Sequence, residues 1–134
     1  MNLDIFMADN VERLPDKEVV ISERFKVDDE PVKWKFRPIS AEQSDQLMEK
    51  AMRFDNNGNF DFDPIVFAKL LTAESIVYPD LKNASLQDSY GVTSPEELLT
   101  VMLYSGEYAK ASKTAQEINQ VNDLDTLAGE VKNE

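Results

Sequence analysis

The sequence has no cysteine and no histidine among its 134 residues. Without cysteine the chain can form no disulfide, thiolate nucleophile or thiolate metal ligand. Without histidine it lacks the usual general base near neutral pH and the commonest metal ligand. Serine–histidine and cysteine–histidine catalysis are therefore excluded, which leaves only carboxylate, lysine or tyrosine chemistry. We predict that the protein is not an enzyme and holds neither a cofactor nor a metal.

Long apolar runs and glycine-rich loops are also absent. No window approaches the roughly 20 apolar residues that a membrane-spanning helix needs. The start, Met1-Asn2-Leu3-Asp4, lacks the basic residues and the apolar run of a signal peptide. Only four glycines occur, and none forms a phosphate-binding loop. We therefore expect a soluble, cytoplasmic protein.

Charge of one sign dominates the chain. There are 26 acidic and 14 basic side chains, which gives a formal net charge of −12. Nucleic acids and anionic membranes attract basic surfaces, so neither is expected as a partner. An acidic surface favours basic or amphipathic protein partners instead. A second interpretation, that the charge only keeps the protein in solution, is left open.

Length and composition predict one globular domain. The chain is 42% hydrophobic and 30% charged, the balance of an ordinary globule. We divide it into an N-terminal segment with a hairpin (1–39), a helical part (40–120) and an acidic tail (121–134) that forms at most a loosely held amphipathic helix. The predicted fold is α+β: an N-terminal β-hairpin or small antiparallel sheet packed against four to five helices.

The hairpin is predicted from two strands, 18–25 and 31–37, joined by an acidic turn at 28–30. In the second strand, apolar and basic side chains alternate, which is typical of a half-buried strand. Its apolar face carries Val32, Trp34 and Phe36, and its other face carries Lys33, Lys35 and Arg37. We interpret the basic face as solvated, with lysines that discourage edge pairing. A small positive binding stripe is the alternative.

A short apolar cluster precedes the hairpin. Its members are Leu3, Ile5, Phe6 and Met7. The cluster is too short to be stable alone, so we expect it to dock on the body of the domain. The alternative is an arm that binds a partner.

Start signals predict the helices. Ser40 and Gln43 form a capping box for a helix over 41–54. Asp63 before Pro64 opens a central buried helix that continues through residue 77. Ser94 with a following proline opens another helix, which ends at residues 105–106. A last helix is predicted over 107–119, and residues 77–92 are predicted to be a packed, irregular connection.

One motif suggests calcium. The spacing Asp55-x-Asn57-x-Asn59 matches the first half of an EF-hand loop. The match then fails, because Phe60 stands where the loop needs glycine and Val66 where it needs glutamate. We therefore interpret this segment as a polar turn.

Paired carboxylates give no better evidence of chemistry. Glu96 and Glu97 belong to a helix N-terminus, where negative charge is favourable. The acidic run at 28–30 belongs to a turn. Neither pair has a neighbouring apolar sequence that would raise a pKa for acid catalysis, so we assign no catalytic residue.

The order of residues from 77 onward resembles a known family. The matching segments are Val77-Tyr78-Pro79-Asp80-Leu81, residues 86–92, Met102-Leu103, Gly106-Glu107-Tyr108-Ala109 and Gln116-Glu117-Ile118-Asn119. In these segments the chain resembles the XkdN-like tail assembly chaperones of phages and prophages. The resemblance covers nearly the whole chain and is weakest after Gln120.

The resemblance implies a function in phage tail assembly. Such a chaperone binds the tape measure protein and keeps this long helical chain soluble before the tail tube polymerises, and it is absent from the finished virion. We hypothesise that an apolar patch among the C-terminal helices is the docking surface, formed by Leu99, Met102, Leu103 and Tyr108. The competing interpretation is that these four residues are buried core.

Two other classes are left open. An acidic DNA mimic or inhibitor would array carboxylates at phosphate-like spacing on one surface. A structural tail component would assemble into rings or occur in purified particles. Self-association into a homo-oligomer and contact with the tail tube protein are further partner hypotheses.

Overall fold

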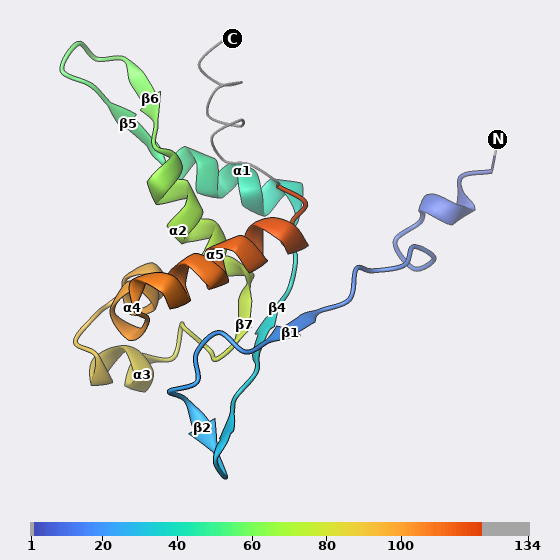
Figure 1. Cartoon of the computed structure of the whole chain (residues 1–134). Coiled ribbons are helices and arrows are strands. Elements are labelled where there is room, and N and C mark those ends of the chain that lie inside the picture. The colour runs from blue at the N-terminus through green and yellow to red at the C-terminus, as the bar shows by residue number, and fades with distance from the viewer. Residues whose placement is uncertain (1, 122–134) are drawn as a thin grey trace.

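The structure is a computed structural model that describes residues 2–121. Within this part of the chain there are five α-helices, one three-stranded antiparallel sheet and two two-stranded hairpins. The predicted α+β class is confirmed. Figure 1 shows the sheet beside the helices, with one hairpin projecting from each end of the molecule. Beyond its first residue, the predicted tail at 121–134 lies outside the described residues.

The three-stranded sheet contains β1 (Lys17–Val19), β4 (Trp34–Phe36) and β7 (Ile76–Tyr78), in the order β1-β4-β7. Val19 lies opposite Trp34 in one pairing, and Phe36 lies opposite Ile76 in the other. Trp34 and Phe36 are 1% and 0% exposed, so the predicted apolar face is confirmed. The sequence analysis wrongly placed residues 76 and 77 in a helix, because pairing with a distant strand outweighs their local pattern.

The two predicted strands of the hairpin pair with each other, but each is divided into two short strands. The distal part of the hairpin consists of β2 (Lys26–Val27) and β3 (Glu30–Pro31). Asp28 and Asp29 join them with φ of 54° and 65°. Positive φ at both central residues is typical of a type I′ turn, which matches the twist of the flanking strands. The long first strand is broken where the Ser22 hydroxyl accepts the amide of Arg24.

Two of the three residues on the basic face of this sheet, Lys35 and Arg37, lie beside acids of the same chain. The Arg37 guanidinium donates two hydrogen bonds of 3.0 Å to Asp16. This contact lowers the pKa of the Asp16 carboxyl. Lys35 lies directly opposite Glu18 in the ladder. The arrangement supports the interpretation of a solvated strand face over that of a positive binding stripe.

The helices are α1 (Ala41–Lys50), α2 (Pro64–Ser75), α3 (Ala84–Ser89), α4 (Pro95–Met102) and α5 (Ser105–Ile118). The capping box of α1 is confirmed: the Ser40 hydroxyl accepts the Gln43 amide, and the Gln43 side chain accepts the Ser40 amide. The end predicted for α1 is wrong by four residues. Residues 52–54 form β5 (Met52–Phe54) instead, which pairs with β6 (Phe60–Phe62).

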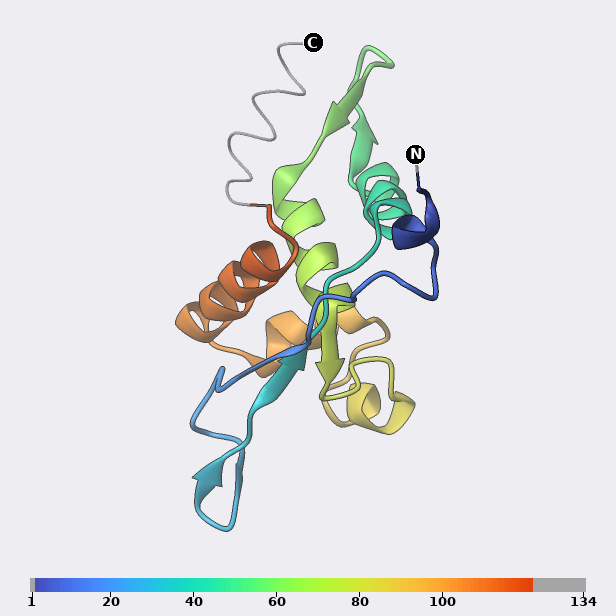
Figure 2. The ribbon, with the colours of Figure 1, turned by 90° about the vertical axis from the view of Figure 1, so that its right-hand side faces the viewer.

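Two hydrophobic clusters hold the domain together. The larger joins the three-stranded sheet to α4 and α5, and the smaller joins α1, α2 and β6. Helix α2 packs against α1, α4 and α5, so it is the central helix that its composition predicts. Figure 2 shows α2 running between the two ends of the molecule, from the β5–β6 hairpin to β7.

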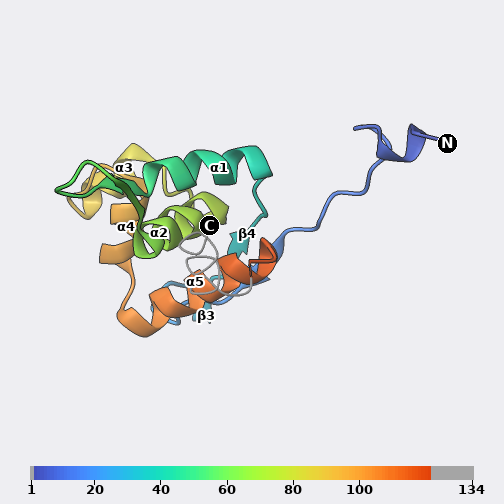
Figure 3. The same ribbon diagram turned by 90° about the horizontal axis from the view of Figure 1, so that it is seen from above.

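The N-terminal segment does not dock on the body. Residues 2–14, which include the short 3₁₀-helix η1 (Asp4–Phe6), extend away from the helices and the sheet (Figures 1 and 3). The expectation that the apolar cluster caps the core is therefore wrong. Within residues 2–121 these four side chains are between 54% and 71% exposed, which favours the alternative of an arm.

Candidate partner-binding surface

Three of the four residues predicted to dock a partner belong to the larger core cluster, and the fourth packs against it. Leu99 is 0% exposed, and Met102 and Leu103 are each 6% exposed. Tyr108 is partly buried and packs against the same cluster. Burial raises the pKa of its hydroxyl. The structure thus brings the four residues together, mostly beneath the surface, and their part in binding stays a prediction.

Met102 differs from the other three because it lines an apolar groove. The groove lies between the root of the β2–β3 hairpin, the end of β7, and α3. Its volume is about 230 Å³. The lining residues are Phe25, Val32, Trp34, Tyr78, Pro79, Leu86, Tyr90 and Met102.

The walls of this groove come from segments far apart in the sequence. The amide of Val32 donates a 2.8 Å hydrogen bond to the carbonyl of Phe25, which holds the two sides of the hairpin root together. The rings of Phe25 and Trp34 pack with their centroids 6.1 Å apart. On the opposite wall, Tyr90 ends α3. The groove is therefore assembled only when hairpin, sheet and helices pack together.

The size of the groove suits a protein partner. Small-molecule sites usually enclose about 300–1,000 Å³, whereas this groove holds about 230 Å³. Its lining is mainly aromatic and aliphatic, with no ionisable group other than two tyrosine hydroxyls. It can therefore accept one or two apolar side chains, and it offers no acid, base or metal ligand set.

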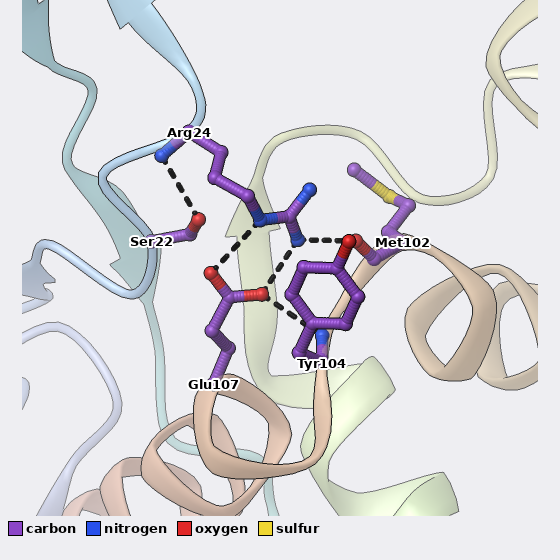
Figure 4. A network of polar contacts seen from close by, with 5 residues as sticks. All are labelled: Ser22, Arg24, Met102, Tyr104 and Glu107. Carbon is purple, nitrogen blue, oxygen red and sulfur yellow. Dashed lines mark hydrogen bonds and ion pairs between the residues drawn. The ribbon is translucent and has the colours of Figure 1, made fainter.

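A polar network fixes the hairpin root against the helices beside this groove (Figure 4). The Arg24 guanidinium donates hydrogen bonds to both carboxylate oxygens of Glu107 and to the carbonyl of Met102. It also lies 5.1 Å from the centre of the Phe25 ring and 4.4 Å from that of Tyr104. Arg24 therefore connects Phe25, which lines the groove, to the junction between α4 and α5.

Glu107 is the acceptor at the centre of this network. The hydrogen bonds from Arg24, then from Ser22 and from the Tyr104 amide, lower the pKa of Glu107 to about 2. The same carboxylate caps the start of α5 by accepting the amide of Tyr104 at 2.8 Å. One side chain thus starts α5 and anchors the groove.

We expect the Glu107→Gln variant to lose less stability than wild type as the pH is lowered. A carboxylate with a lowered pKa stabilises the fold above its unfolded value, about 4.5, and this stabilisation is lost as the pH falls towards about 2. The variant should therefore be less stable than wild type at pH 7, and the difference should shrink between pH 4.5 and pH 2. Denaturant midpoints measured across this range test the prediction.

Glu49→Gln is the matched control, because it removes the same charge from an exposed position on α1. The difference in denaturant midpoint between Glu49→Gln and wild type should change less with pH than the difference between Glu107→Gln and wild type. A gap between wild type and Glu107→Gln that stays constant down to pH 2 would show that the Arg24 contact does not hold this carboxylate.

The tip of the β5–β6 hairpin is a second exposed apolar feature. The rings of Phe54 and Phe60 pack with centroids 4.2 Å apart on the solvent side. The Asp55 carboxylate accepts the amides of Asn57 and Asn59, at 2.8 and 2.9 Å. These hydrogen bonds lower the pKa of Asp55. The segment is the polar turn that the sequence predicted.

Among residues 2–121, no group of three or more acidic side chains is arranged to hold a metal ion. In the same part of the chain, no helix has the length and apolarity needed to cross a membrane.

Comparison with known proteins identifies the family. Residues 3–133 match the model of the phage XkdN-like tail assembly chaperone proteins. The chain therefore belongs to this family, and the resemblance inferred from the sequence is confirmed. A search of curated proteins returned no match.

The fold is also found in a solved structure. The crystal structure of the protein YqbN superposes with a TM-score of 0.78 at 28% sequence identity. The match covers 90% of this chain and 97% of that one. The arrangement of helices and small sheets is therefore shared with YqbN over most of both chains.

Proposed function

We propose that this tail assembly chaperone binds the tape measure protein of its phage or prophage and keeps it soluble before the tail tube polymerises. The observation that carries the proposal is an apolar groove, sized for side chains, on a domain with a net charge of −12. Family membership supports it, because a tail assembly chaperone must have a protein partner in the phage tail.

A tape measure protein is a long helical chain whose amphipathic stripes associate with one another when they are exposed. A partner that accepts apolar side chains from such a stripe covers the surface that aggregates. Its negative charge attracts basic residues beside the stripe and makes the resulting complexes repel one another. Binding without catalysis is sufficient for this role.

The groove also refines the docking surface predicted from the sequence. Met102 forms part of the groove lining, where it can touch a side chain of the partner. We propose that Leu99, Leu103 and Tyr108 act from beneath, by fixing α4 and the start of α5 in place. Leu99→Ala or Leu103→Ala should then destabilise the domain, and should not weaken binding by protein that remains folded.

The proposed place of action is the cytoplasm of the bacterial host, before tail completion. The protein is not expected in the mature virion, and no catalytic step is assigned to it. Co-expression with the tape measure protein of the same genome tests the proposal directly. A soluble tape measure protein that co-purifies with this chain would support it. An insoluble, unbound tape measure protein beside a folded chain would overturn it, and purified particles should then be probed for this chain.

Substitution at the groove gives a sharper test. Tyr90 lines the groove and is partly exposed, so Tyr90→Ser should leave the core intact. We expect it to reduce the recovered tape measure protein by about tenfold, the usual effect of removing an aromatic anchor. The matched control is Val101→Ser, an exposed apolar residue of α4 that does not line the groove. Equal recovery with both variants would exclude the groove as the docking site.

A further inference from the structure

The N-terminal arm, residues 2–14, leaves an unusual amount of apolar surface in water. Its six large apolar side chains are each between 52% and 71% exposed. They are Leu3, Ile5, Phe6, Met7, Val11 and Leu14. Isolated exposed apolar residues are ordinary, but a contiguous group of this kind marks an interaction site.

The sequence of the arm has the period of an amphipathic helix. Leu3, Met7, Val11 and Leu14 are separated by four, four and three residues, so they would form one stripe along a helix. Ile5, Asp9 and Glu12 would lie on the opposite side. Pro15 follows directly and would end the helix after the last member of the stripe.

The arm already carries the start of such a helix. The Asn2 side chain accepts the Asp4 amide at 2.9 Å, as a residue at a helix N-cap does. Asp4 would then lie in the first turn, where negative charge is favourable. The amides of Asn10 and Val11 both donate to the carbonyl of Met7, which makes an isolated helical turn further along.

What the free arm lacks is a surface to pack against. A helix over residues 3–14 would have only 12 residues, at the lower limit for stability in water. In the structure only η1 and single turns form, and most of the arm runs away from the helices and the sheet (Figure 3). The full helix would gain its stability from burying the stripe on a partner.

The charge of the arm indicates which partner. Asp4, Asp9 and Glu12 outnumber its single basic residue, Arg13. A second copy of this chain carries a net charge of −12 and would repel it. A helix with an apolar stripe flanked by lysine or arginine would be attracted and would match the stripe.

The body continues this surface at the base of the arm. Leu14 and Pro15 line two open hollows of about 730 and 450 Å³. The larger hollow also includes Pro38 and Ile39, and the smaller one Ile118. A partner helix that lies along the arm would therefore find further apolar side chains where the arm joins the domain.

We propose that the arm folds on binding into an amphipathic helix over residues 3–14, which packs its Leu3–Met7–Val11–Leu14 stripe against a basic amphipathic helix of the tape measure protein. This proposal rests on the proposed function and names a second docking element, distinct from the groove. An arm that projects from the body can meet the partner before the groove engages, and the two contacts then act together on one chain.

The stripe is tested by paired variants of the full-length chain. Leu3→Ser, Met7→Ser and Val11→Ser combined should reduce the amount of chain recovered with tagged tape measure protein by about tenfold or more. Ile5→Ser is the matched control, because it removes an equally exposed apolar side chain from the opposite side of the helix. The amount of the Ile5→Ser chain recovered with tagged tape measure protein should be at least half that of wild type.

The helix is tested separately from the stripe. Asp9→Pro would break a helix over residues 3–14 in its middle, yet residue 9 donates none of the backbone hydrogen bonds seen in the free arm. Asp9→Asn is its control, because it removes the same charge and permits the helix. Recovery should fall with Asp9→Pro alone. Hydrogen exchange of wild type should slow at residues 6–14 once tape measure protein is bound.

The outcomes separate this inference from the function on which it rests. If wild type fails to bind the tape measure protein, the proposed function is overturned. If wild type binds and the stripe variant or Asp9→Pro binds equally well, only the arm proposal is overturned. Equal losses with Ile5→Ser and with the stripe variant would also overturn it. The arm proposal would also be overturned if wild type formed a concentration-dependent dimer that the stripe variant abolishes, since the arm would then pack on a second copy.

Discussion

Phe36→Ala is expected to lower the free energy of unfolding by about 3–5 kcal/mol, the usual cost of truncating a buried phenylalanine. Phe36 lies on the central strand of the three-stranded sheet and is fully buried in the larger core cluster. Strands bonded on both sides cannot move inward to fill the space, so most of the cavity should persist. Urea unfolding followed by the fluorescence of Trp34, the single tryptophan, measures the effect.

Phe54→Ala provides the matched control. It removes the same side chain from the tip of the β5–β6 hairpin, where Phe54 is 68% exposed and touches Phe60. We expect a cost of about 1 kcal/mol or less, since little surface returns to water and no cavity forms. Equal costs for the two variants would show that Phe36 is not the centre of the core.

Local signals in the sequence identified the start of α1, α2 and α4, but not that of α5. That helix begins at Ser105, where the sequence analysis wrongly placed a break at residues 105–106, and α4 already ends at Met102. Ser40, Asp63 and Ser94 each accept an amide two or three residues ahead, as their position before a helix predicts. Such hydrogen bonds depend only on neighbouring residues, so a sequence can specify them without the fold. One signal of the same kind was overlooked: Asn83 accepts the Leu86 amide and opens α3.

Elements that depend on distant partners were predicted poorly. Residues 76–78 continue the apolar composition of α2, yet they form a strand because β4 is available to pair with them. Met52 to Phe54 extend the helical pattern of α1, yet they pair with β6 across a turn. In both places the competing hydrogen bonds come from a strand that periodicity alone cannot identify.

In the candidate site, too, single residues were identified from the sequence, whereas the arrangement that depends on distant segments was not. Met102 was singled out from the sequence, and residues 77–92 were noted for their family resemblance. The groove itself could not be predicted, because its walls come from the hairpin root, the sheet, α3 and α4. The N-terminal arm shows the reverse, since its apolar residues were plain in the sequence but their expected docking on the body is absent from the structure.

Asn119→Leu is expected to lower the free energy of unfolding by about 1–3 kcal/mol, although leucine is nearly the same size. The Asn119 side chain accepts the Ile39 amide at 2.8 Å and donates to the Ser75 hydroxyl at 2.9 Å. It therefore joins the end of α5 to the end of α2 and to the segment before α1. Leucine would leave a partly buried amide and a buried hydroxyl without these partners. Urea midpoints at pH 7 measure the loss.

A double-mutant cycle isolates the contact with Ser75, whose side chain is fully buried. Ser75→Ala removes the hydroxyl that Asn119 bonds, so Asn119→Leu should cost less in that background than in wild type. We expect a coupling of about 0.5–1.5 kcal/mol, the net value of one hydrogen bond between neutral groups. Strictly additive costs would show that the bond does not stabilise the fold. Asn119 would then act through its other two contacts, the Ile39 amide that it accepts and the Ala115 carbonyl to which it donates at 2.8 Å.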